Sequence, residues 1–120
     1  MAKTTKKDFE LFKKECLKWI KIFGLYSYET SFEHDVCVKG SVASCEMNIN
    51  ARWANLGLAK KPSISSKESI KLSAFHEVME VFIGRLRVCA LSRFVNEDEI
   101  EEANHEIIRT LENVVYPKLK

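Results

Sequence analysis

The stretch from Ser66 to Ser92, SKESIKLSAFHEVMEVFIGRLRVCALS, decides the fold. Its large apolar residues recur every three or four positions, which is the period of one helix face. We therefore expect a helix over about 67–92, with Ser65 or Ser66 as its N-cap. The apolar stripe of this helix is expected to comprise Leu72, Phe75, Met79, Phe82 and Leu86.

The chain before this helix changes from one periodicity to another. Apolar residues at helical spacing predict a helix over about 7–23, and Gly24 is a suitable residue to end it. Polar and apolar residues then alternate over 26–34 and, less regularly, over 41–50, and a third short segment spans 51–58. These segments predict a small antiparallel sheet of two to four strands.

A last helix is expected after the long one. Asn96 can cap it, because it precedes three acidic residues of the kind that stabilise a helix N-terminus. Pro117 is expected to end it, and its apolar face is expected to comprise Ile100, Ala103, Ile107, Leu111 and Val114. The predicted class is thus α+β in one domain over 1–120: an N-terminal helix, a small antiparallel sheet, an active-site helix and a C-terminal helix. Residues 1–6 are expected to be disordered.

Length and composition narrow the possible functions. A chain of 120 residues is too short for a two-domain enzyme, and a net charge of +2 does not favour nucleic-acid binding. No segment resembles a signal peptide or a membrane span, so we expect a soluble cytoplasmic protein without a membrane partner. The four cysteines, none in a CxxC pair, do not predict a zinc knuckle and are expected to stay reduced; they are Cys16, Cys37, Cys45 and Cys89.

The helix of 67–92 carries the residues most suited to chemistry. His76 and Glu80 are four residues apart, so on a helix they lie on one face and could share a metal ion. Glu77 lies beside them and could act as a general base. This H-E-x-x-E pattern has the geometry of the zinc motif H-E-x-x-H with a carboxylate in place of the second imidazole, which zinc accepts. The sequence also allows Glu80 simply to pair with Arg85 or Arg87 on the surface.

A catalytic zinc needs a third protein ligand. His105 in the last helix is the first choice, because imidazole is the commonest metal-binding side chain. His105 lies well off the centre of the predicted apolar stripe and Glu101 lies closer to it, so Glu101 remains a substitute ligand. His34, at the end of a predicted strand beside Asp35, is more typical of a turn than of a ligand.

The order of elements and the sequences AFHEVME and NHEIIRTLEN resemble small zincin-like metallopeptidase proteins. Residues 72–115 are similar to short phage and prophage proteins with the same pair of helices. The resemblance implies that His76, Glu80 and His105 are metal ligands and that Glu77 is the base. It also implies that the sheet offers an edge strand to an extended peptide. The second histidine of the zincin signature is Glu80 here, which could weaken zinc or favour another divalent ion.

The leading hypothesis is therefore a zinc-dependent hydrolase, a minimal metallopeptidase in the cytosol of an infected or lysogenic bacterium, with a peptide or protein substrate. The alternative is a non-catalytic phage accessory protein that binds a host protein and has a degenerate or structural metal site. The two hypotheses differ in what Glu77 does, since only an enzyme requires its carboxylate.

Overall fold

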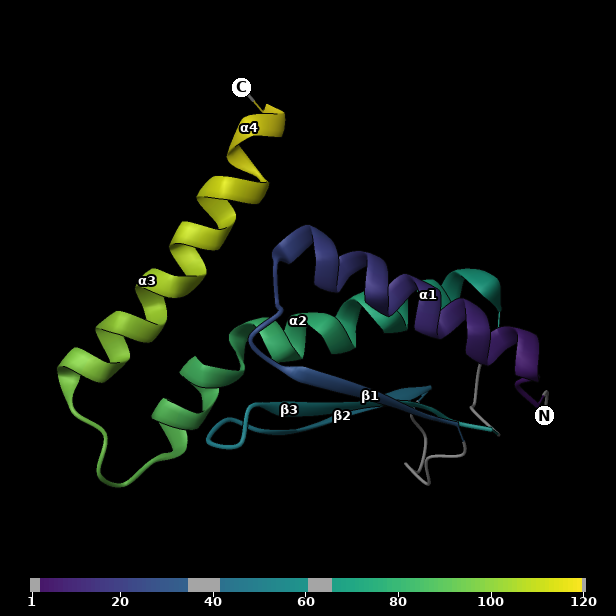
Figure 1. The fold of residues 1–120 in the computed structure, drawn as a ribbon, viewed down its shortest axis with the longest axis horizontal. Coiled ribbons are helices and arrows are strands. Elements are labelled where there is room, and N and C mark those ends of the chain that lie inside the picture. The colour runs from purple at the N-terminus through teal and green to yellow at the C-terminus, as the bar shows by residue number, and fades with distance from the viewer. Residues whose placement is uncertain (1–2, 35–41, 61–65, 120) are drawn as a thin grey trace.

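The computed structural model describes residues 3–34, 42–60 and 66–119 (Figure 1). The predicted α+β class is confirmed, with one helix, a three-stranded sheet and further helices in that order. The helices are α1 (Lys6–Phe23), α2 (Lys67–Leu91), α3 (Glu97–Val114) and a short α4 (Tyr116–Leu119), and the strands are β1 (Glu29–His34), β2 (Ala43–Asn48) and β3 (Trp53–Leu58). No helix within these residues is both long and apolar enough to cross a membrane.

Local sequence signals place the helix ends. Gly24 ends α1 in the left-handed conformation, with φ of 65°, as predicted. The predicted caps Ser66 and Asn96 both accept a backbone N–H with their side chains, from Ser69 and Glu99 respectively. Ser65, the other candidate cap, and Cys37 lie outside the described residues. Pro117 does not end α3, which stops at Val114; it lies inside α4.

The beginning of the chain is attached to the end of the sheet. The hydroxyl of Thr4, a buried residue, donates to the carbonyl of Ala59 at 2.6 Å and lies 2.9 Å from Nε2 of His34. The backbone N–H of Thr4 donates to the carbonyl of Lys60 at 2.8 Å. The disorder expected for residues 1–6 therefore does not extend to Thr4. His34, which also stacks on Phe9, has a packing role here.

The sheet differs from the prediction in one pairing. Its strand order is β1-β3-β2, and β1 pairs with β3 in parallel, whereas β2 and β3 are antiparallel. The sheet is thus mixed rather than antiparallel, because the chain returns after β1 to build a hairpin whose second strand lies between the other two. As a result β2 is an edge strand.

The core lies between one face of the sheet and the helices α1 and α2, which run side by side above it (Figure 1). The buried side of α2 comprises Ile70, Ala74, Val78 and Val81, together with Glu77. This side is rotated from the stripe expected from the sequence, and Leu72 is consequently 69% exposed. The stripe of large side chains in the sequence therefore does not identify the α2 residues that are buried most deeply.

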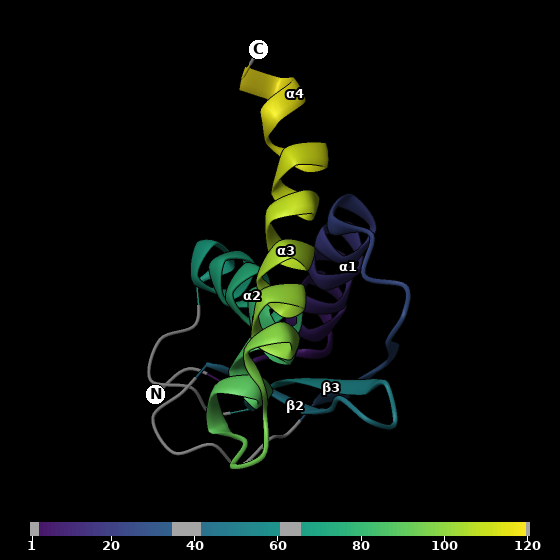
Figure 2. The same ribbon diagram turned by 90° about the vertical axis from the view of Figure 1, so that its left-hand side faces the viewer.

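Helix α3 stands away from the rest of the molecule. It contacts mainly the second half of α2, and α4 lies at its far end (Figures 1 and 2). Of the apolar face predicted for α3, only Ala103 is buried, whereas Ile100 and Leu111 are each 40% exposed.

Candidate metal and acid–base site

His76 and Glu80 lie together on the solvent side of α2, as predicted. Nε2 of His76 is 3.6 Å from Oε1 of Glu80. Two protein ligands on one tetrahedral zinc ion stand roughly 3.4 Å apart. The pair therefore fits two positions of a metal site without rearrangement. The alternative predicted from the sequence, in which Glu80 pairs with Arg85 or Arg87, is not found: Arg85 binds Glu102 and Glu106, and no ion pair joins Arg87 to Glu80.

Glu77 lies on the inward side of the same helix. The residue is only 9% exposed, and no hydrogen bond reaches its side chain from another described residue, so its carboxylate oxygens are the part that stays in contact with solvent. Burial raises the pKa of this carboxyl, partly opposed by His76, while the neighbouring charge of Glu80 raises it further. A carboxyl with a raised pKa is a stronger base once ionised, which suits a group that accepts a proton near neutral pH.

The edge strand β2 lies beside this part of α2. Cys45 and Met47 of β2 and Glu80 and Gly84 of α2 line a cavity of about 240 Å³. A Cβ atom at Gly84 would lie 2.6 Å from Sδ of Met47, so a residue without a side chain lets the helix approach the strand closely. The cavity thus lies between Glu80 of α2 and the edge strand β2.

Cys45 was not predicted as a site residue. Burial, with the nearby charges of Glu77 and Glu80, raises its pKa to about 12, so its thiol is protonated at neutral pH. The period-two pattern of β2 does show that Cys45 and Met47 share a face. Their position next to Glu80 depends on strand order, however, which the sequence pattern alone does not contain.

The predicted third ligand does not lie at this site. Within the described ranges, no three His, Cys, Asp or Glu side chains are grouped closely enough to hold a metal ion. His105 and Glu101 are exposed on α3, which packs against a different side of α2. The chain therefore brings together His76, Glu77 and Glu80 but does not add His105 or Glu101 to them.

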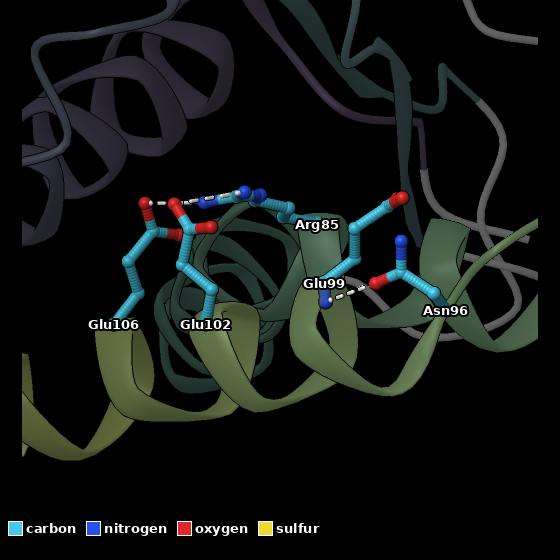
Figure 3. A network of polar contacts seen from close by, with 5 residues as sticks. All are labelled: Arg85, Asn96, Glu99, Glu102 and Glu106. Atoms are coloured by element: carbon cyan, nitrogen blue, oxygen red, sulfur yellow. Dashed lines mark hydrogen bonds and ion pairs between the residues drawn. The ribbon is translucent and has the colours of Figure 1, made fainter.

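Arg85 of α2 holds α3 through two ion pairs. Its guanidinium binds Glu106 at 2.9 Å and Glu102 at 3.3 Å, so one α2 residue holds two successive turns of α3 (Figure 3). Arg85 follows His76 by nine residues, which places it about 180° around the helix and about 14 Å further along it. The surface of α2 that binds α3 is therefore opposite to the surface that carries His76.

Comparison with known proteins gives no further guidance. No family model matches the chain, and neither a curated protein nor a solved structure matches it.

Proposed function

We propose that this protein is a metal-dependent hydrolase that cleaves peptide bonds and uses zinc or a similar divalent ion. The observation that carries the proposal is the placement of Glu77, a largely buried residue whose carboxyl has a raised pKa, next to a His76–Glu80 pair at ligand spacing. Buried carboxyl groups are costly unless they are paired or used. A role in proton transfer would make use of the raised pKa.

His76 and Glu80 would hold the ion. When bound, it would supply an activated water and polarise a substrate carbonyl. Glu77 would accept a proton from the attacking water and pass it to the leaving amine. Its burial raises its pKa and so strengthens it as a base.

The geometry of β2 supports an extended peptide as the substrate. An edge strand has free backbone N–H and C=O groups that can pair with another strand. A peptide added to β2 would run past Glu80, and the cavity beside Cys45 and Met47 could receive one of its side chains. This placement would bring a scissile bond near Glu77.

The second candidate is a non-catalytic binding protein, and one observation favours it. A catalytic zinc has three protein ligands, and the described part of a single chain groups only two. In that case the same edge strand would bind a partner protein without cleaving it.

Glu77→Gln tests the proposal. The wild-type protein should contain stoichiometric zinc by elemental analysis and should cleave an unfolded protein such as casein. The variant should keep its zinc, because Glu77 is not a ligand, but should lose at least about 100-fold in rate with the base removed. Glu10→Gln, an equally conservative change on the exposed side of α1, is the matched control. Absence of zinc from the wild type, or equal rates for wild type and Glu77→Gln, would refute the enzyme and favour the binding protein.

A further inference from the structure

A cavity lies between α3 and the rest of the molecule, and neither His76 nor Glu80 lines it. Its volume is about 200 Å³, and its walls come from the end of α1, the β2–β3 turn, α2 and α3. It adjoins a second hollow of about 410 Å³, which shares Phe23, Gly24 and Thr110 with it. Part of the wall is apolar, and this part comprises Phe23, Val81 and Phe82. The cavity therefore has room and an apolar surface for a small organic molecule.

Arg52, in the turn between β2 and β3, lines this cavity in an unusual backbone conformation. Its φ is 58°, the one positive φ of a residue other than glycine in the described part of the chain. Glycine or asparagine adopts this left-handed conformation with less strain than arginine does. Residues in strained conformations are concentrated at binding and catalytic sites. The turn thus holds a guanidinium at a position that a glycine would fit more easily.

The guanidinium of Arg52 is held in place without a carboxylate partner. Its Cζ atom lies 5.5 Å from the centre of the Tyr28 ring, and the backbone carbonyl of Arg52 accepts the N–H of Glu29 at 2.8 Å. Over the described ranges, no ion pair reaches Arg52. Its N–H donors are therefore open to an anion from solution.

Positive groups outnumber negative groups around the cavity. Arg52 and Arg85 line it together with one carboxylate, that of Glu106, which Arg85 already binds at 2.9 Å (Figure 3). Lys21 lines the adjoining hollow, and Glu102, the other partner of Arg85, lines neither. Since Arg85 and Glu106 neutralise each other, Arg52 and Lys21 leave two positive charges in excess. This excess matches a phosphomonoester, which carries about −1.5 to −2 charges at pH 7.

We propose that this cavity binds a phosphomonoester with an apolar body and that Arg52 holds its phosphate group. A guanidinium donates two parallel hydrogen bonds to a phosphate. Ser27 and Tyr28 line the same cavity and carry hydroxyl groups that can donate to the remaining phosphate oxygens. The apolar body would pack against Phe82 and its neighbours. The site shares no residue with the proposed metal site, so it stands independently of the proposed function.

Phenyl phosphate is the probe that tests the assigned ligand class. It is titrated by calorimetry into the full chain at pH 7.5 and constant ionic strength, with EDTA present so that no metal ion contributes. The protein should bind it saturably at one site and about 10-fold more tightly than inorganic phosphate, because the ring adds apolar contact. No saturable binding, or equal affinities for phenyl phosphate and inorganic phosphate, would overturn the assignment.

Arg52→Asn tests the role of the guanidinium. Asparagine adopts positive φ readily, so the variant should fold, as circular dichroism can verify, but should bind phenyl phosphate at least about 10-fold more weakly. Arg93→Asn is the matched control, because Arg93 also lies near an aromatic ring, 6.0 Å from the centre of Phe94, but does not line the cavity. The control should bind as the wild type does. Equal binding by Arg52→Asn and the wild type would refute the proposal.

Discussion

Glu77, Cys16 and Cys45 form a buried group of acidic side chains from three different elements. The pKa of the Cys16 thiol is raised by burial and then by the charge of Glu77, and that of Cys45 is raised to about 12 for the same two leading reasons. The charge of Glu77 thus makes ionisation of both thiols less favourable. At neutral pH both thiols are neutral, and Cys16 packs as a small apolar residue.

The neutral thiols predict low chemical reactivity, because the thiolate is the nucleophile in alkylation. Iodoacetamide at pH 8 should leave Cys16 and Cys45 unmodified in the folded protein and should modify both in urea. Peptide mapping by mass spectrometry resolves each cysteine separately and gives the check. Rapid modification of Cys45 under native conditions would contradict its raised pKa. As pH rises towards 12, the Cys45 thiolate forms and folded-state alkylation should accelerate.

At the scale of elements, α3 depends on few contacts. Asn96 accepts the N–H of Glu99 at its start, and Arg85 binds two of its carboxylates (Figure 3). Ion pairs at a surface typically contribute less than about 1 kcal/mol each. We therefore expect α3 to open more readily than α1 or α2, which share the core.

Arg85→Ala should loosen α3 selectively. The expected change in the free energy of unfolding is about 1 kcal/mol, whereas amide hydrogen exchange across 97–114 should accelerate strongly. Exchange in α1 should not change. Arg109→Ala, which removes an exposed arginine from α3 itself, is the control and should leave exchange close to wild type. Equal exchange in wild type and Arg85→Ala would show that Arg85 does not hold the helix.

The elements divide into those that local sequence predicts and those that it does not. Gly24, Ser66 and Asn96 act through their immediate neighbours, so these three helix ends followed from residue type and position, whereas the end of α3 expected at Pro117 did not. The same holds for His76 and Glu80, which one helical turn brings together. The parallel pairing of β1 with β3 and the position of Cys45 beside Glu80 depend on contacts distant in sequence. The place of α3 likewise depends on Arg85, which periodicity alone could not assign.

The whole molecule is more extended than its length requires. The radius of gyration is 15.5 Å, compared with about 13.6 Å for a compact domain of this length. The difference comes from α3 and α4, which project from the layers formed by the sheet and the first two helices (Figure 2). The sheet, α1 and α2 thus form a compact unit from which α3 and α4 project.

Small-angle scattering tests this shape. The protein as a monomer should have a radius of gyration about 2 Å above the compact value. The distribution of interatomic distances should have a tail at long distances, which arises from α3 and α4. A compact value would mean that α3 lies against the sheet and the first two helices in solution.

The strand order β1-β3-β2 also has a consequence for how the chain folds. The β2–β3 hairpin closes a short turn and can form early, on the microsecond scale typical of hairpins. Strand β1 joins the sheet later, because its partner β3 lies 24 residues further along the chain, as in the pair Glu29 and Trp53. Thr4 can be fixed against Ala59 and Lys60 only after β3 is in place. The residues just before α1 would therefore be among the last to reach their final positions.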